Sequence, residues 1–474
     1  MFAQLVSLLG ADAVLTDPAD TAPYRSDLLQ RYHGSALAVV RPRCTDDVSR
    51  TVGLCAANKV AITPYGGGTG FCGGAIPIPD RPHIVLSLER MRQIRSADPA
   101  GDTMVAEAGC TLAQVRQAAD DINRLFPVSH GGEGTSQIGG MIATNAGGNN
   151  VVLYGMARAQ ILGLEVVLAD GTIWNGLRAL RKDNSGYDVK QLFIGSEGTL
   201  GIVTAATLAL RQKPVARATA LAAVAGPQEA LDLYVHLRAH CAGLIAAMEL
   251  IPRAGLDLHF ARLPSPVEPF RDGHGWMVLI ELETIIPDLD LAPLLEARLV
   301  SALERGTAHD VVIAQSETQR LAFWALREGI AEAQASNRRV LKSDTAVPVS
   351  ASAAFIREAT HRVGNILPGA TPIPFGHLGD GNIHFNVLAP ADMETEQFQG
   401  HLPALTQTIE AAALALGGTI SAEHGLGQSK RASVAATKPE IDIEMMKRIK
   451  AAFDPDNRLN PGKVIEFDRA QPRS

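Results

Sequence analysis

Hydrophobic and polar positions in the first half of the chain follow the short periods of strands, with a few helical stretches between them. "AITPYG", "HIVLSLERM", "TMVAEAG" and "GTLGIVTAATLAL" predict strands, because apolar and β-branched residues alternate or run together in short blocks. "CTDDVSRTVGLCAANKV", capped by Thr45 or Asp46, and "TLAQVRQAADDI", capped by Thr111, predict helices. "LGLEVVLADGTIW" predicts a strand pair that turns at Gly171. This mixture is typical of an α+β fold.

The pattern changes near Pro214, within "RQKPVARATA". Beyond it, "PQEALDLYVHLRAH" and "QRLAFWALREGIAEAQA" carry apolar residues at helical spacing, and "GWMVLIELE" predicts a strand between them. The C-terminal "FDPDNRLNPGKVIEF" is rich in turn residues. We therefore divide the chain into a first domain at residues 1–215, with its core at about 36–215, a second domain at 216–450, and a C-terminal segment at 451–474.

The length of 474 residues predicts more than one domain. The composition is that of a globular protein, because 46% of the residues are hydrophobic and 20% are charged. The net charge of −7 and the lack of a basic stripe argue against a nucleic-acid partner. The five cysteines are scattered without a C-x-x-C pair, which argues against iron–sulfur and Cys-rich zinc sites. Scattered thiols, a start without a basic signal-peptide region and no bilayer-length apolar run predict a soluble, cytoplasmic protein, and peripheral contact with a membrane stays open.

The segment "PYGGGTGFCGG" at residues 64–74 matches the dinucleotide fingerprint G-x-G-x-x-G at Gly68, Gly70 and Gly73. That fingerprint requires a helix to begin within it, and the three prolines of the following "AIPIPDRP" forbid such a helix. A Rossmann fold is therefore excluded. The loop can still bind phosphate through its exposed backbone N–H groups, although a plain structural turn is the alternative for this loop alone.

Two further glycine-rich segments follow, "GTSQIGGMIATNAGGNNVVLYG" at residues 134–155 and "IGSEGTLGIVT" at residues 194–204. In the first of these, Thr144 and Asn145 place a hydroxyl and an amide between two glycine pairs. Three glycine-rich loops with small polar residues in one α+β half favour a long ligand that lies along the backbone.

The order and spacing of "PYGGGTG", "IGGMIATNAGG", "ILGLEVVLADG" and "IGSEGTLGIVT" resemble the FAD-binding domain of the vanillyl-alcohol oxidase and p-cresol methylhydroxylase superfamily. The resemblance implies a two-part FAD-binding domain whose first loop holds the pyrophosphate. Since that loop lacks a histidine, non-covalent FAD is expected. The implied cofactor-binding residues are Pro64, Gly66, Gly67, Gly68, Thr69, Gly70, Ser136, Gly139, Gly140, Thr144, Asn145, Gly147, Gly148, Glu197, Gly201, Ile202 and Asn460.

Residues 374–386 read "PFGHLGDGNIHFN", in which His377 and His384 flank a glycine-rich turn. A tight turn would bring the flanking strands side by side, so that both imidazoles could face one point. Glu423 and His424 in "SAEHGLG" add a carboxylate and another imidazole. Two histidines and a carboxylate form a ligand set for Zn²⁺ or a similar divalent ion, with coordination positions left open for a substrate. Histidines that only hydrogen-bond the backbone are the alternative.

A second resemblance covers "FGHLGDGNIHFN", "SAEHGLGQSKR" and "FDPDNRLNPGK", which are similar to the C-terminal domain of FAD-linked D-2-hydroxyacid dehydrogenases. It implies an α+β substrate- and metal-binding cap domain with an antiparallel sheet, and a C-terminal segment that returns to the FAD domain. The implied metal ligands are His377, His384 and Glu423. The implied catalytic residues are the base His424, the substrate contact Asn386, and the carboxylate-binding cations Arg327 and Lys342.

The resemblance implies that a D-2-hydroxyacid is oxidised to the 2-oxoacid. In such a reaction a metal ion would lower the pKa of the substrate hydroxyl, His424 would accept its proton, and FAD would accept a hydride from Cα at flavin N5. D-2-hydroxyglutarate is the first candidate and D-lactate or glycolate the second. Ala331 stands where a hydroxyglutarate-oxidising member carries a threonine, so one hydroxyl contact is missing. Without the resemblance, Arg327 would be a surface residue paired with Glu328, and Lys342 a solvated strand end.

Two other classes stay open at this point, a metal hydrolase without flavin and a non-catalytic flavin-binding subunit. Since the sequence has no haem or iron–sulfur motif, an external electron acceptor is expected, such as an electron-transfer flavoprotein, a quinone or a cytochrome. Direct use of O₂ also stays open. Zn²⁺ suits the ligands, and Mn²⁺ is the alternative. Related enzymes are often dimers, so a homodimer is a further expectation.

Overall fold

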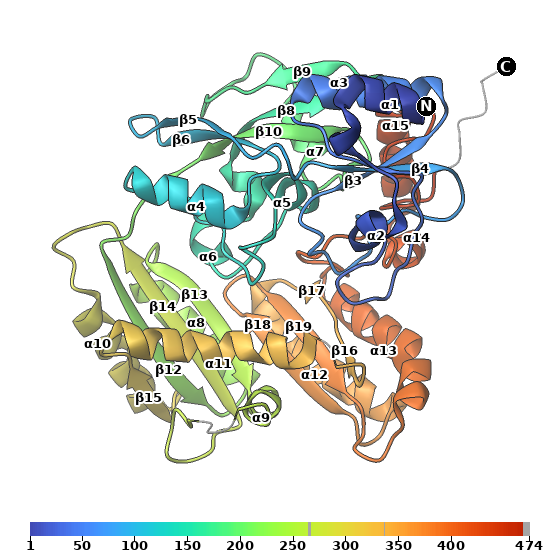
Figure 1. Cartoon of the computed structure of the whole chain (residues 1–474). Coiled ribbons are helices and arrows are strands. Elements are labelled where there is room, and N and C mark those ends of the chain that lie inside the picture. Colours follow the sequence, from blue (N-terminus) through green and yellow to red (C-terminus); the bar gives the residue numbers. More distant parts are fainter. Residues whose placement is uncertain (264–266, 336, 468–474) are drawn as a thin grey trace. The chain divides into compact units, whose positions relative to one another are not determined.

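The structure is a computed structural model that describes residues 1–263, 267–335 and 337–467 (Figure 1). The chain divides into two compact units. Unit 1 comprises Met1–Gly148, Gly155–Lys213 and the residues from Glu423 onward, and unit 2 comprises Asn149–Tyr154 and Pro214–Ala422. Helices and largely antiparallel sheets occur in both units, which confirms the predicted α+β class.

The first sheet of unit 1 has the strand order β1 (Val14–Leu15), β2 (Val39–Val40), β4 (His83–Ser87) and β3 (Ala61–Tyr65). Strand β4 runs parallel to both β2 and β3. Helices α1 (Phe2–Leu9) and α3 (Thr45–Ala57) share one apolar core with this sheet, through residues such as Leu5, Val48 and Ile84. Burial of these side chains, at about 1.5–3 kcal/mol each, holds the two helices on the sheet.

The cap predicted for α3 is wrong. The N-cap of α3 is Cys44, and no side chain caps the helix. The hydroxyl of Thr45 instead donates a hydrogen bond to the carboxylate of Glu165, which lies on a strand of the second sheet. A tertiary partner has therefore displaced the local cap.

The second sheet of unit 1 is antiparallel, in the order β5 (Ile94–Asp98), β6 (Thr103–Glu107), β10 (Ile202–Ala209), β8 (Ile161–Val167) and β9 (Ile173–Gly176). Helices α4 (Leu112–Asp121) and α5 (Ile138–Thr144) pack in its core. Thr111 caps α4 as predicted, because its hydroxyl accepts a hydrogen bond from the backbone N–H of Gln114, and its own backbone N–H donates one to the side-chain oxygen of Gln114. The smaller elements of this unit are α2 (Pro18–Thr21), β7 (Arg124–Leu125), α7 (Lys190–Phe193) and β11 (Arg211–Gln212).

The chain returns to unit 1 at Glu423, through α14 (Arg431–Thr437) and α15 (Glu440–Phe453). The sequence interpretation assigned residues up to 450 to the second domain, whereas the structure groups residues 423–450 with unit 1. Long-range hydrogen bonds explain the grouping. The buried ammonium of Lys450, for example, donates to the carbonyl oxygens of Thr199 and Leu459 at 2.8 and 2.9 Å.

Unit 2 is built on an antiparallel sheet in the order β15 (Asp310–Ile313), β12 (Ala216–Val224), β14 (Trp276–Thr284), β13 (Ile245–Pro252), β18 (Thr371–His377), β19 (Asn382–Leu388) and β16 (Val340–Leu341), with β17 (Thr345–Ala346) also paired to β19. Helices α8 (Pro227–His240), α10 (Leu291–Glu304), α12 (Ser352–Ile366) and α13 (Thr395–Ala415) share the core on one face. Helices α9 (Arg253–Phe260) and α11 (Glu317–Ala335) cover the other (Figure 1). The short α6 (Val151–Tyr154) also belongs to this unit.

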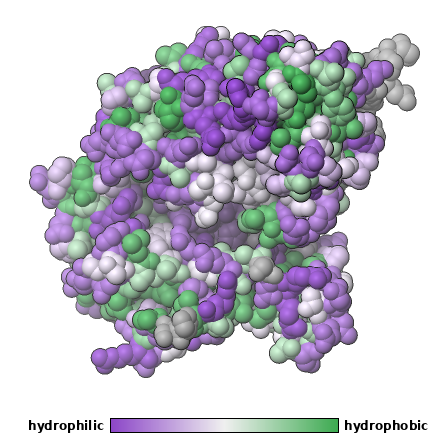
Figure 2. All heavy atoms as spheres, in the orientation of Figure 1, coloured by the Kyte–Doolittle hydropathy of each residue, from purple (hydrophilic) through white to green (hydrophobic). Residues whose placement is uncertain are grey.

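Hydrophilic residues predominate on the face of the molecule shown in Figure 2, and hydrophobic residues there form separate groups. Among the described residues, no helix combines the length and apolarity that a membrane-spanning segment needs.

Candidate active site

The loop after β3 carries the first glycine cluster, and in the described residues no helix lies between Gly73 and β4. This confirms that the fingerprint match is not a Rossmann motif. A Cβ at Gly67 would lie 2.0 Å from the carbonyl oxygen of Thr135, and one at Gly66 would lie 3.4 Å from Cα of Gly140. The first two glycine clusters therefore pack backbone to backbone, which residues without side chains permit.

The other residues predicted to bind the cofactor lie in the same loops or at the ends of the adjoining elements. Several of them have protein partners. Gly139 packs against Ala108, where a Cβ would lie 2.8 Å from the Ala108 methyl, and Asn145 accepts a hydrogen bond from the Arg158 amide at 2.9 Å. Pro64 lies on β3, Thr69 and Gly70 follow it, Ser136 precedes α5, Thr144 ends α5, Gly147 and Gly148 follow α5, Gly201 precedes Ile202 on β10, and Asn460 lies in the C-terminal turns.

Glu197 has a role that the sequence did not predict. Its buried carboxylate accepts hydrogen bonds from the backbone N–H groups of Leu426 and Gly427, at 2.6 and 2.9 Å. Burial raises the pKa of Glu197, and these N–H groups act in the opposite direction. The carboxylate thus fixes the segment that follows Glu423 and His424, rather than being directed only to a cofactor.

His377 and His384 lie on a hairpin, as the sequence predicted. Strands β18 and β19 pair so that Phe375 lies opposite His384 and His377 opposite Asn382. The turn requires Gly381, because its φ is 83° and a Cβ there would lie 2.1 Å from a backbone oxygen. The two imidazole ring centroids are 5.6 Å apart, in a T-shaped arrangement. The hairpin therefore places both rings on one face of the sheet.

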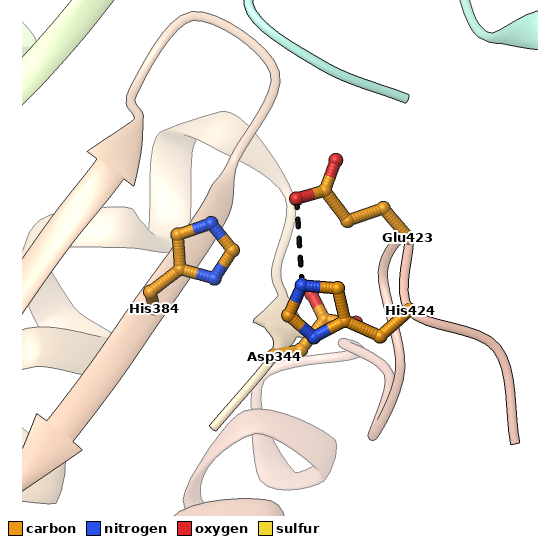
Figure 3. Close-up of side chains that lie close together, drawn as sticks. All are labelled: Asp344, His384, Glu423 and His424. Atoms are coloured by element: carbon orange, nitrogen blue, oxygen red, sulfur yellow. Dashed lines mark ion pairs between the residues drawn. The ribbon is translucent and has the colours of Figure 1, made fainter. Parts of the chain in front are cut away.

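The structure gathers a four-residue group of possible metal ligands, with ligand atoms within 4.8 Å of one another, at Asp344, His384, Glu423 and His424. Figure 3 shows His384, Glu423 and His424 directed toward a common region, with an ion pair of 3.9 Å between His424 Nε2 and Glu423 Oε1. The backbone N–H of Ala422, the residue just before Glu423, donates to Asp344 Oδ2 at 3.2 Å. The sequence interpretation missed Asp344, although it follows Lys342 by only two residues.

His377 is outside this four-residue group, although the sequence interpretation made it a ligand. Its Nδ1 lies 2.8 Å from Glu249 Oε1, and both side chains are buried. A ligating histidine commonly uses one ring nitrogen for the metal and the other for a carboxylate. The role of His377 as a ligand therefore stays a prediction, and its contact with Glu249 is of the kind that this role requires.

Arg327 is buried on α11 and is not the surface residue of the alternative interpretation. Its Nε donates to Glu249 Oε2 at 2.7 Å, and its guanidinium carbon lies 4.9 Å from the centroid of the Phe375 ring. Ala331, one turn later on the same helix, is exposed.

Lys342 and Asn386 both have protein partners in the structure. The ammonium of Lys342 donates to the carbonyl oxygen of Ala335. Asn386 is buried; its Oδ1 accepts from the Ser343 amide at 2.8 Å, and its Nδ2 donates to Gln334 Oε1 at 2.6 Å. The predicted substrate contact of Asn386 would have to use its remaining hydrogen-bonding capacity.

Comparison with known proteins assigns both halves of the chain to families of FAD-linked proteins. Residues 36–176 match the family model "FAD binding domain", and residues 213–464 match "FAD linked oxidases, C-terminal domain". The chain belongs to the FAD-linked oxidase family. It is 37% identical over 458 residues to "D-2-hydroxyglutarate dehydrogenase, mitochondrial" of Bos taurus, covering 95% of this chain and 81% of that protein. It is 35% identical over 463 residues to "D-2-hydroxyglutarate dehydrogenase" of Stutzerimonas stutzeri, covering 98% of each.

Solved structures share the fold of this FAD-linked oxidase. p-Cresol methylhydroxylase with substrate bound has a TM-score of 0.75 at 17% sequence identity, covering 97% of this chain and 95% of that one. 4-Ethylphenol oxidase from Gulosibacter chungangensis has a TM-score of 0.75 at 18% identity, covering 98% and 96%. The predicted vanillyl-alcohol oxidase type of fold, with a FAD-binding domain and an antiparallel sheet in the second domain, is thereby confirmed.

The loops of this FAD-linked oxidase are suited to FAD. The side-chain oxygens Oδ1 of Asn460 and Oε1 of Gln137 are buried and have no hydrogen-bond partner among the described residues. Asn460 Nδ2 donates to the carbonyl oxygens of Gly74 and Glu197 at 2.9 and 2.8 Å, which holds the amide in this orientation. Buried acceptors in native proteins normally have a donor, and FAD carries N–H and O–H donors. Gln137 was missed, although it lies between the predicted Ser136 and Gly139.

The donor set of the four-residue group is suited to a divalent ion. Two imidazoles and two carboxylates supply nitrogen and oxygen ligands, the types that Zn²⁺ takes in catalytic sites and that Mn²⁺ also accepts. His384 and Glu423 belong both to the four-residue group and to the ligand set implied by the sequence, so these two residues would hold the ion in both cases. Asp344, His377 and His424 are the candidates for the remaining ligands.

Replacing Gly67 by alanine is expected to reduce FAD retention strongly. The new Cβ would lie 2.0 Å from the Thr135 carbonyl oxygen and 2.9 Å from Cα of Ser136, so the two glycine clusters would have to separate. We expect overpacking to cost about 1–3 kcal/mol, which corresponds to an affinity loss of about 5- to 150-fold. The measurement is the ratio of flavin absorbance to protein after gel filtration.

Gly53→Ala is the matched control, because a Cβ at Gly53 on α3 has nothing within 4 Å. This variant should retain FAD like the wild type and be slightly more stable, since alanine is the better helix former. Full FAD retention in folded Gly67→Ala would contradict the close packing of the two glycine clusters.

Proposed function

We propose that this protein oxidises a D-2-hydroxyacid to the 2-oxoacid with FAD and a divalent metal ion, and that D-2-hydroxyglutarate is its preferred substrate. The observation that carries the proposal is the convergence of His384, Glu423 and His424, together with Asp344, in a chain of the FAD-linked oxidase family. The names of the Bos taurus and Stutzerimonas stutzeri relatives support the substrate.

When bound, FAD supplies a two-electron acceptor, and a divalent ion supplies a Lewis acid for the substrate oxygens. The chain supplies orientation, charge and a proton acceptor. His424 suits the last of these roles, because a neutral imidazole is the commonest general base in enzymes. Its ring stands edge-on to Phe71, with centroids 5.0 Å apart, and its side chain is 27% exposed, so a substrate proton can reach it.

Arg327 suits the binding of a substrate carboxylate. Among the described residues, Arg327 donates a hydrogen bond through Nε alone, to Glu249. The terminal guanidinium nitrogens can therefore offer the two-pronged geometry that matches a carboxylate. Lys342 supplies a second cation, which suits a dicarboxylate substrate such as D-2-hydroxyglutarate.

D-Lactate is the second candidate substrate. The "Putative D-lactate dehydrogenase, mitochondrial" of Schizosaccharomyces pombe is 33% identical over 476 residues, covering 97% of this chain and 89% of that protein. Ala331 cannot offer the hydroxyl contact that the resemblance associates with hydroxyglutarate. We propose that the electrons leave to an external acceptor, such as an electron-transfer flavoprotein or a quinone.

Replacing Lys342 by alanine tests the choice between these substrates. We expect kcat/KM for D-2-hydroxyglutarate to fall about 10- to 100-fold, because one charge-assisted contact to the distal carboxylate is lost. The value for D-lactate, which has no distal carboxylate, should change much less. Turnover of both D-isomers would be followed with an artificial electron-accepting dye.

Lys438→Ala is the matched control, because Lys438 is exposed. This variant should leave kcat/KM for both substrates unchanged. Equal losses for the two substrates in Lys342→Ala would argue against a distal-carboxylate role. A wild type that turns over neither D-isomer with FAD and metal present would argue against the proposed function itself.

A further inference from the structure

Glu249 links two residues of the candidate active site that are far apart in the sequence. It lies on β13, directly opposite His377 on β18, in adjacent strands of the unit 2 sheet (Figure 1). One carboxylate oxygen lies 2.8 Å from His377 Nδ1, and the other accepts a hydrogen bond of 2.7 Å from Arg327 Nε. Its side chain is 1% exposed, so water does not compete for these contacts.

The buried carboxylate of Glu249 forms an ion pair with the guanidinium of Arg327, so its charge is compensated inside the sheet. A buried charge is tolerated when it is paired and hydrogen-bonded on its polar atoms, and here each oxygen has its own partner.

The contact with His377 fixes one imidazole. A carboxylate that accepts a hydrogen bond from Nδ1–H holds the ring in one tautomer and one orientation, with Nε2 as the ligating nitrogen. The His377 ring stands 5.6 Å from that of His384, which belongs to the four-residue group. Its Nε2 is therefore presented on the same face of the hairpin as a member of that group.

The contact with Arg327 fixes one guanidinium. The Nε hydrogen bond to Glu249 and the Phe375 ring, 4.9 Å from the guanidinium carbon, constrain the plane of the group from an edge and from a face. Phe375 precedes His377 by two residues on β18, so both side chains lie on the same face of the sheet. The terminal nitrogens of Arg327 are thereby held in one direction.

We propose that Glu249 is a positioning residue that holds His377 for the metal ion and Arg327 for the substrate carboxylate at the same time. Affinity for the metal and affinity for the substrate would then depend on a single carboxylate that contacts neither. The proposal rests on the proposed function for the substrate half and on the ligand role of His377 for the metal half.

Glu249→Gln tests the proposal. A neutral amide keeps the size of the side chain, but it cannot accept hydrogen bonds from His377 and Arg327 at both of its polar atoms. We expect the affinity for Zn²⁺ to fall about 10- to 100-fold, as for other carboxylates that hold a ligating histidine. Zn²⁺ affinity would be measured on chelator-treated, FAD-loaded protein by competition with a chromophoric chelator. KM for D-2-hydroxyglutarate should rise by a similar factor, and kcat should change less.

Glu281→Gln is the matched control. Glu281 is also buried, lies on the neighbouring strand β14 and accepts hydrogen bonds from Arg320 and Trp324 at 3.0 and 2.9 Å. It does not contact His377 or Arg327 in the described structure. Glu281→Gln should therefore leave Zn²⁺ affinity and KM at their wild-type values, even if it lowers the melting temperature.

The outcomes separate the two halves of the proposal from the proposed function. Zn²⁺ affinity within about threefold of the wild type in folded Glu249→Gln, or a wild type that binds no Zn²⁺, overturns the metal half. Weaker Zn²⁺ binding with unchanged KM overturns the substrate half. If Glu249→Gln does not fold, Glu249→Asp keeps the charge but shortens the side chain, and unchanged Zn²⁺ affinity there overturns the metal half equally. Failure of the wild type to oxidise any hydroxyacid contradicts the proposed function. It does not affect the test of the metal half, because Zn²⁺ affinity is measured without substrate.

Discussion

Replacing His424 by asparagine is expected to slow reduction of the flavin by D-2-hydroxyglutarate about 100- to 10,000-fold, with FAD still bound. The reason is that asparagine keeps a polar side chain of similar reach but cannot accept the hydroxyl proton. His424 is placed for this task, since its Nε2 lies 3.9 Å from Glu423 Oε1 within the four-residue group. The measurement is the rate of loss of the oxidised flavin absorbance in an anaerobic stopped-flow experiment.

His361→Asn is the matched control, because His361 is exposed on α12 and lies outside the four-residue group. This variant should be reduced at the wild-type rate. A rate for His424→Asn within about tenfold of the wild type would show that another group accepts the proton.

Replacing His384 by alanine is expected to abolish binding of the proposed divalent ion and to lower kcat/KM for D-2-hydroxyglutarate about 1,000-fold or more. Loss of a metal ion removes several kcal/mol of charge stabilisation, and each 1.4 kcal/mol is about a factor of ten. His384 lies in the four-residue group, and its ring also contacts those of Phe375 and His377. Metal content by elemental analysis and steady-state turnover would be measured on the same preparations.

Wild-type protein treated with a chelator provides the comparison for His384→Ala. It should lose activity in the same way and regain it when Zn²⁺ or Mn²⁺ is added, whereas His384→Ala should not recover at the same concentrations. Wild-type metal content and activity in His384→Ala would rule out His384 as a ligand.

Features that depend on local sequence could be predicted. Strands β3, β4, β6, β8, β9 and β10 of unit 1, the Thr111 cap and the β18–β19 hairpin follow from apolar alternation, capping chemistry and turn glycines, which act within a few residues. The three prolines after Gly73 likewise excluded a Rossmann helix, and the structure has none there. Each of these features is decided by residues next to one another in the chain.

Features that depend on distant partners could not be predicted. Thr45 hydrogen-bonds Glu165 instead of capping its helix, and Glu197 hydrogen-bonds a segment more than two hundred residues later. Glu249 gave one local signal, since it is a carboxylate inside the apolar strand "IAAMELIP", but its partners were not evident. Arg327 gave another local signal, because it lies at helical spacing from Phe323 and Ile330, so that all three share the buried face of α11.

The measurement that tests the central claim most directly is the visible spectrum of the purified protein under anaerobic conditions, before and after addition of D- and L-2-hydroxyglutarate and D- and L-lactate. We predict an oxidised flavin spectrum that D-2-hydroxyglutarate bleaches rapidly, D-lactate bleaches more slowly or not at all, and the L-isomers leave unchanged. A flavin spectrum that none of the four compounds changes, with Zn²⁺ or Mn²⁺ supplied, would contradict the account.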